Sequence, residues 1–187
     1  MARKSEEILQ LAGQCLASPS PERVEAVRKL DSDIDELEVK VDRMCVELLA
    51  LQEPYAIDFR FVFSAIKMIK DFERVGDECK TVAKWSVRLP AASEPRLQTL
   101  AERSSAALRT AVKALVEDNR EAAEVVMQIE FTVDALEDEI VESTDSIATA
   151  FIAKALERTG VLATNVAEDV IFTLSAKDIR HGHFDDQ

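Results

Sequence analysis

Glycine and proline are scarce in this chain, and the few that occur leave long uninterrupted segments between them. Its 187 residues contain four glycines and five prolines. Sheets and long loops need more turn residues than this, whereas long helices need few. Proline is tolerated in the first turn of a helix but not in its interior, so each proline marks a break. The breaks stand at Pro19, Pro21, Pro54, Pro90 and Pro95 and predict an all-α protein.

Six helical segments are predicted between these breaks. Apolar residues recur along the longer segments in alternating steps of three and four, which is a sustained heptad pattern. We expect Ser20 to cap the second helix, Ser93 the fourth, and Asp118 or Asn119 the fifth. The predicted helices cover residues 2–17, 21–52, 55–89, 95–116, 121 onwards and 147–174. The seam of the second helix consists of Val27, Leu30, Ile34, Leu37, Val41, Met44 and Leu48, and that of the third begins at Phe61.

The second half of the chain repeats the first. Residues 31–38 read DSDIDELE and residues 130–137 read EFTVDALE, with acids at matching positions. Residues 72–85 read FERVGDECKTVAKW and residues 156–169 read LERTGVLATNVAED. The offsets of 99 and 84 residues differ by 15, which removes about two turns from each helix of the second hairpin. We therefore predict two tandem antiparallel three-helix bundles, the second with a shortened hairpin and a polar tail. The predicted units are residues 1–90 and residues 91–187.

The net charge of −13 narrows the range of partners. An acidic surface repels phosphate backbones and anionic lipid, so nucleic-acid binding is not expected, whereas metal cations or basic protein surfaces are attracted. Solubility alone is another explanation of the acidity. The charged N-terminus lacks a signal-type apolar region, and no stretch approaches the roughly 20 apolar residues of a membrane-spanning helix. The three cysteines lie apart and are expected to be buried free thiols, which suits a cytoplasmic protein.

Carboxylates flank the apolar seams of the first predicted hairpin. Asp31 and Asp35 lie one turn apart on its first helix, and Glu73 and Asp77 lie one turn apart on its second. A turn at Pro54 brings the two pairs to the same level, because Asp35 is 19 residues before it and Glu73 is 19 residues after it. Gathered carboxylates repel one another unless a proton or cation intervenes. We therefore predict an oxygen-rich site for a divalent or iron ion (Mg, Ca, Mn, Fe or Zn).

Other interpretations of these acids stay open. A stripe of acids on a helix is commonly a solvated face. Three nearby cations, Arg43, Arg74 and Lys80, would neutralise the carboxylates without any metal. Gly76, on the same side as the acids, would then serve only to let two helices pack closely.

The second half keeps only part of this pattern. Glu130, Asp134 and Glu157 stand at matching positions, but Val161 replaces the carboxylate of Asp77. We therefore predict that a second metal site is weaker or absent. Both histidines lie in the polar tail, so histidine ligands for oxidative di-metal chemistry are lacking and no enzymatic activity is expected.

Three longer motifs resemble those of the PhoU family of phosphate-uptake regulators. They are ALQEPYAIDFR at residues 50–60, IKMIKDFERVGDECKTVAKW at 66–85 and IAKALERTGVLATNVAEDVIFTLSAKDIRH at 152–181. The family pattern has a Pro-x-Ala-x-Asp-Leu-Arg turn, an E-R-x-x-D motif in each repeat and a closing Arg-His block. The resemblance covers the chain after about residue 22. It implies a fold of two three-helix repeats side by side.

The resemblance also implies a set of site residues. The family's metal sites are assigned to Glu/Asp-x-x-x-Asp motifs, and its turn and E-R motifs single out Asp58, Arg60, Arg74 and Gly76. Val161 and Leu162 stand where the family usually has Asp-His, so the second site departs from the family pattern. The matched metal residues are Asp31, Asp35, Glu73, Asp77, Glu130, Asp134 and Glu157.

The function implied by the resemblance is regulatory. PhoU proteins damp phosphate import through a Pst-type ABC transporter and help to switch off a PhoR-type histidine kinase at the cytoplasmic face of the membrane. A non-enzymatic negative regulator is therefore expected, with a transporter ATPase and a sensor kinase as partners. An accessory role for another phosphate or ion transporter, a metal-free helical scaffold and a di-metal carboxylate oxidase are the alternatives. Long exposed helices also leave room for a homodimer.

Overall fold

The computed structural model describes residues 1–51, 56–89 and 95–175, and every regular element within them is an α-helix. This confirms the all-α, six-helix prediction. The helices are α1 (Ala2–Ala17), α2 (Pro21–Leu51), α3 (Ala56–Ser86), α4 (Pro95–Glu117), α5 (Arg120–Ser143) and α6 (Ile147–Ser175). The predicted turn at Pro54, the predicted cap Ser93 and the polar tail after residue 175 lie outside the described residues.

Two of the predicted helix caps are present. The Arg23 amide donates to Ser20 Oγ at 3.3 Å, and the Ala122 amide donates to Asn119 Oδ1 at 3.0 Å. Such side-chain acceptors satisfy amides that have no partner in the first turn of a helix. Asn119, and not Asp118, therefore caps α5. The third helix ends at Ser86, three residues before the predicted Leu89, and closes in a tighter turn.

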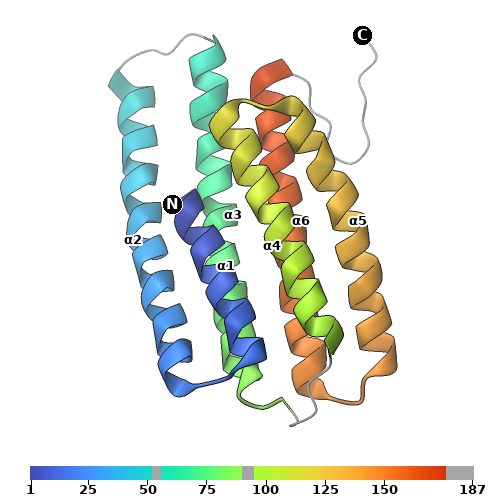
Figure 1. Cartoon of the computed structure of the whole chain (residues 1–187). Helices are drawn as coiled ribbons and strands as arrows, with labels where there is room; N and C mark the ends of the chain where they lie inside the picture. The colour runs from blue at the N-terminus through green and yellow to red at the C-terminus, as the bar shows by residue number, and fades with distance from the viewer. Residues whose placement is uncertain (52–55, 90–94, 176–187) are drawn as a thin grey trace.

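The six helices form two layers (Figure 1). One layer contains α2, α3, α6 and α5 in that order, and α1 and α4 lie in front of it. Helices α1, α2 and α3 pack on one another as one antiparallel bundle, and α4, α5 and α6 pack as the other. The two bundles meet mainly through α3 and α6, which run in opposite directions. The core is continuous across this contact, because buried residues of all six helices belong to one cluster.

A buried serine marks the same position in both bundles. Ser5 Oγ on α1 donates to the Phe72 carbonyl of α3 at 3.3 Å, and Ser104 Oγ on α4 donates to the Leu156 carbonyl of α6 at 2.8 Å. The serines differ by the 99-residue offset and the carbonyls by the 84-residue offset of the sequence repeat. The short helix of each repeat therefore docks on its long partner through the same contact.

The second hairpin is shortened as predicted. Helix α2 continues from Asp35 to Leu51, whereas α5 continues from the matching Asp134 only to Ser143. The missing length is about two turns. At this end of the molecule α2 and α3 extend beyond the start of α1 (Figure 1).

The predicted seam of the first hairpin is not buried along its whole length. Val27 and Ile34 are fully buried, but Met44, Leu48 and Phe61 are 52%, 39% and 52% exposed. A heptad pattern places these side chains on one face, but none of the described helices covers that face near the hairpin end. The prediction that the seam is a core element is therefore wrong for its last two turns.

Burial predicts which leucines support this fold. Leu156 is fully buried in α6, whereas Leu51 at the end of α2 is 79% exposed. We expect Leu156→Ala to lower the free energy of unfolding by about 2–5 kcal/mol, because it removes buried methyl groups and leaves a cavity. The matched Leu51→Ala substitution should change it by less than about 0.5 kcal/mol. Urea denaturation followed by circular dichroism measures both values, and equal losses would contradict the described packing.

Candidate functional site

A lysine lies between the facing carboxylates of the first repeat. Lys80 Nζ is 2.7 Å from Asp31 Oδ2 on α2 and 2.7 Å from Asp77 Oδ1 on its own helix, α3. Asp31 is only 5% exposed, and the other two side chains reach the surface. The structure therefore brings Asp31 and Asp77 together, as the sequence predicted, around an ammonium group.

Burial and charge act against each other in this group. Burial raises the pKa of the Asp31 carboxyl above its ordinary value, because an ionised group loses hydration there. The Lys80 ammonium opposes this rise, and the charges of Asp35 and Asp77 add to it. Burial alone would lower the pKa of Lys80, but its bonds to Asp31 and Asp77 raise that pKa. Lys80 is therefore fully charged at neutral pH.

Glu73 and Asp35 belong to the same group of acids on α2 and α3. Burial raises the pKa of Glu73, and Asp77, Glu38 and Asp35 raise it further by repulsion. These carboxylates are therefore close enough to sense one another across α2 and α3. A second lysine, Lys70, relieves part of the repulsion, because its Nζ lies 2.6 Å from Glu38 Oε1.

Gly76 makes room for the buried carboxylate. A Cβ atom added at Gly76 would lie 2.6 Å from Asp31 Oδ1, well inside van der Waals contact. That oxygen is buried and has no hydrogen-bond partner within the described residues. The glycine therefore permits close helix packing, as one interpretation of the sequence held, and what packs against it is Asp31.

The second repeat is built differently. Glu157 and Asp134 lie close enough to interact. Burial raises the pKa of Glu157, Lys154 opposes this rise, and repulsion by Glu137 and Asp134 adds to it. Burial, followed by repulsion from Asp134, also raises the pKa of Glu130. The fully buried acid here is Glu137, whose Oε2 lies 2.8 Å from Lys154 Nζ. Lys154 and Glu137 stand at the repeat positions of Lys70 and Glu38. The first-repeat group around Lys80 has no counterpart, because the matching positions hold Val161 and Thr164.

The remaining predicted residues lie apart from the carboxylates. Asp58 is exposed in the first turn of α3. Arg60 is half-buried, and its Nε has no hydrogen-bond partner within the described part of the chain. Arg74 is exposed and lines a groove between α3 and α6. The structure thus places Arg74 on the side of α3 that faces α6, away from the acids shared with α2.

The α3–α6 groove carries buried charges that the sequence did not reveal. Asp71 is 8% exposed and accepts a hydrogen bond from Asn165 Nδ2 at 3.4 Å. Asp169 is also buried and forms an ion pair with Lys67. At the other end of the same contact, Trp85 stacks on Phe151 with ring centroids 4.7 Å apart.

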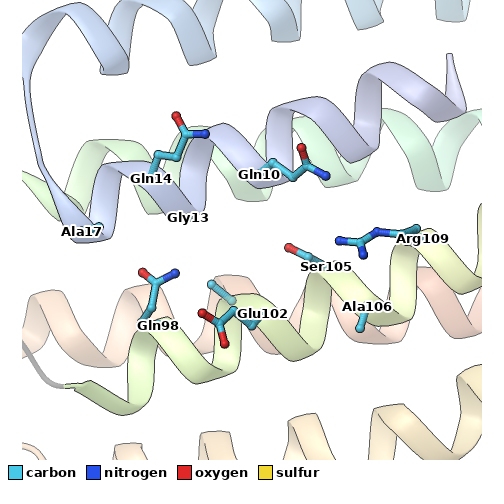
Figure 2. A pocket seen from close by; sticks show the side chains of 10 residues that line it. Gln10, Gly13, Gln14, Ala17, Gln98, Glu102, Ser105, Ala106 and Arg109 are labelled. Carbon is cyan, nitrogen blue, oxygen red and sulfur yellow. The ribbon is translucent and has the colours of Figure 1, made fainter.

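A third groove separates α1 from α4 (Figure 2). It has a volume of about 530 Å³ and contains none of the residues predicted from the sequence. Its floor consists of small residues such as Gly13, and amide side chains including Gln14 and Gln98 border it (Figure 2). It marks the front junction between the two bundles.

The positions of the carboxylates determine whether a metal ion fits among them. Among the described residues, no three Asp, Glu, Cys or His side chains are placed to hold one ion together. In the first repeat Lys80 already binds Asp31 and Asp77, and the free oxygen of Asp31 lies against Gly76. The donor set of the first repeat, as arranged here, therefore does not fit a metal.

The fold and these grooves define a class of protein: a duplicated three-helix bundle with paired carboxylates and lysines between the long helices of each repeat. Comparison with known families identifies the family within this class. The model of the PhoU domain matches residues 1–86 and 97–170, so the chain belongs to the PhoU family.

Sequence relatives and solved structures agree with this assignment. The chain is 31% identical over 172 residues to a phosphate-specific transport system accessory protein PhoU homolog of Pseudomonas aeruginosa, covering 83% of this chain and 71% of that protein. It is 29% identical to the Aquifex aeolicus homolog over 98% of this chain and 90% of the other. The crystal structure of PhoU from Pseudomonas aeruginosa superposes with a TM-score of 0.85 at 26% identity, covering 95% of this chain and 93% of that one. PhoU from Streptococcus pneumoniae gives 0.84 at 25% identity, with coverage of 95% and 91%.

Sequence reasoning missed the lysine–glutamate pairs, although a signal was present. Lys70 and Lys154 both stand three residues before the Glu-Arg pair of their repeat, and Glu38 and Glu137 both end the acid pattern. Aligning the two halves for cations as well as acids would have matched these positions.

The two glycines offer a matched test of the first-repeat geometry. A Cβ at Gly76 would meet Asp31 Oδ1 at 2.6 Å, whereas one at Gly160 would meet Val133 Cγ1 at 3.1 Å. We expect Gly76→Ala to lower the free energy of unfolding by about 1–2 kcal/mol through overpacking, despite the better helix propensity of alanine. Gly160→Ala should lose less.

The cause can be isolated by a double substitution. With Asp31→Ala already present, the clash at position 76 is absent, and Gly76→Ala should then stabilise the protein by up to about 1 kcal/mol. Chemical denaturation of the four variants of this cycle measures the coupling. Additive effects would rule out the contact between Asp31 and Gly76.

Asp71 predicts a dependence of stability on pH. Burial raises its pKa, Asp169 adds to the rise, and the Asn165 amide, Arg74 and Lys67 oppose it. A carboxyl whose pKa is higher in the folded state binds more protons there, so stability rises as pH falls through the folded pKa toward the unfolded one. The wild type should therefore be more stable at pH 5.5 than at pH 7.5.

The matched variant is Asp71→Asn, which keeps the size of the side chain and cannot titrate. Its gain in stability between pH 7.5 and 5.5 should be smaller than that of the wild type, because Glu73 and Glu157, whose pKa values are also raised, still contribute. Urea denaturation at both pH values measures the gain. An equal gain in both proteins would show that Asp71 is not responsible.

Proposed function

We propose that this chain is a non-enzymatic accessory regulator of phosphate uptake, acting on a phosphate-specific ABC transporter and on a sensor histidine kinase. The observation that carries the proposal is its membership of the PhoU family together with likeness to PhoU crystal structures over 95% of its length. Its relatives are named as accessory proteins of the phosphate-specific transport system. Negative regulation, a cytoplasmic location and peripheral contact with the membrane through the transporter are parts of the same proposal.

The surface suits recognition of a basic protein partner. The net charge is −13, and long helices present acids such as Glu36, Glu121 and Asp138 to solvent. Complementary charge speeds the encounter of two proteins and selects among partners. Within residues 1–51, 56–89 and 95–175, no helix is long and apolar enough to cross a membrane. We therefore propose that the partners bind to the exposed faces of the helices.

Three finer parts of the sequence-based hypothesis stay predictions. These are a bound Fe, Zn, Mg or Mn ion, a homodimer, and service to a different phosphate or ion transporter. No arrangement of side chains described above favours the carboxylate oxidase, and three of the acids, Asp31, Asp77 and Glu137, are bonded to lysines.

Co-purification tests the proposed partners. Tagged full-length protein should recover an ABC-transporter ATPase and a sensor kinase from the membrane fraction of its native cells, in amounts that differ between phosphate-rich and phosphate-starved cultures. Because the contact is proposed to be electrostatic, recovery should fall severalfold between 50 and 300 mM NaCl. Mass spectrometry of the eluates provides the measurement.

The controls distinguish specific partners from proteins that bind nonspecifically. A mock purification with the tag alone identifies background proteins, and Leu51→Ala tests whether an apolar hairpin end causes the capture. Recovery of a different transporter would replace the phosphate role with another accessory role. Recovery of no membrane component under either condition would contradict the proposal.

A further inference from the structure

Facing carboxylates need a positive charge between them, and in the first repeat the chain supplies one itself. Asp31 on α2, which is buried, and Asp77 on α3 would repel each other. Lys80 Nζ lies 2.7 Å from an oxygen of each. An ammonium group has three donors, and two of them are used here at charge-assisted hydrogen-bond distance.

We infer that the Lys80 ammonium takes the place of a metal ion in the first repeat, so that its carboxylates are held together without metal. Lys80 is tethered to α3 one turn from Asp77 and reaches across to α2. It joins the two long helices as a bridging cation would, and it is present in every molecule regardless of metal supply.

The oxygens of Asp31 leave no ligand for a metal. Oδ2 binds Lys80, and Oδ1 is buried against Gly76, where a Cβ atom would be only 2.6 Å away. Magnesium requires near-octahedral coordination and calcium takes six to eight oxygens, with several waters usual for magnesium. The Asp31 carboxylate is 5% exposed, with one oxygen paired with a lysine and the other enclosed beside Gly76, which leaves no space around it for such a shell.

The second repeat lacks both partners of Asp31. The position that matches Asp77 holds Val161, and the position that matches Lys80 holds Thr164. The carboxylate and the lysine are thus present together in one repeat and absent together in the other. The Lys70–Glu38 and Lys154–Glu137 pairs, in contrast, are present in both. This pattern is expected if Lys80 is the counter-ion of this one pair of acids.

Removal of the lysine should create a metal site where none is used in the wild type. The variant is Lys80→Met, which keeps the aliphatic stem and removes the charge. The probe is Mn²⁺, which prefers oxygen ligands and is detected by electron paramagnetic resonance and by calorimetry after treatment of the protein with a chelator. We expect Lys80→Met to bind one Mn²⁺ at least tenfold more tightly than the wild type. The gain should be absent from Lys80→Met/Asp31→Asn.

Matched variants test the inference even if Lys80→Met folds poorly. Wild type and Asp31→Asn/Asp77→Asn should bind Mn²⁺ equally, because the wild-type carboxylates are already occupied. Lys80→Arg, which keeps the charge, should resemble the wild type. The inference is overturned if the wild type binds Mn²⁺ at least tenfold more tightly than Asp31→Asn/Asp77→Asn. It is equally overturned if folded Lys80→Met binds Mn²⁺ no better than the wild type.

Discussion

The antiparallel contact between α3 and α6 is the constraint on which the rest of the molecule depends. Each repeat is a short helix resting on a hairpin, and the two hairpins become one layer only because α3 and α6 share a core. The sequence repeat relates the two ends of this contact to each other. Lys67 contacts Asp169 at one end, and the matching residues Phe151 and Trp85 contact each other at the other end. An ion pair and an aromatic stack thus occupy equivalent places without disturbing the packing. The apolar surface between these two contacts, and not the ion pair or the aromatic stack, determines how the bundles meet.

The helices and the repeat were predictable because the information for them is local. Proline positions and heptad spacing locate the six segments, and two offset blocks reveal the shortened hairpin. The exposure of Met44 and Leu48 was not predictable in the same way. Periodicity tells which residues share a face of a helix, but whether another helix covers that face is a matter of tertiary packing. The seam was therefore predicted correctly as a face and wrongly as a core.

The candidate site was also predictable only in part. The facing of Asp31 and Asp77 followed from equal distances to one turn, which any antiparallel hairpin must obey. The choice between a metal and a lysine did not follow, because Arg43, Arg74 and Lys80 are all within a few residues of the acids in sequence. Only the rotation of α3 decides that Lys80 points between the helices while Arg74 points to α6. The complete burial of Glu137 depends in the same way on the rotation of α5.

In the first repeat the position of each residue in a group of four depends on the one before it, in the order Gly76, Asp31, Lys80 and Asp77. Without a side chain at Gly76 the Asp31 carboxylate can lie against α3, and once buried it requires a cation. Lys80 supplies that cation, and Asp77 holds it in place. In the second repeat the glycine persists as Gly160, but it packs against Val133. Glu130 stands at the position of Asp31, whereas Val161 and Thr164 replace Asp77 and Lys80. Backbone geometry has thus been kept between the two halves while the electrostatics have diverged. A site transferred from a relative by fold alone would miss this difference, because the fold is the part that both repeats still share.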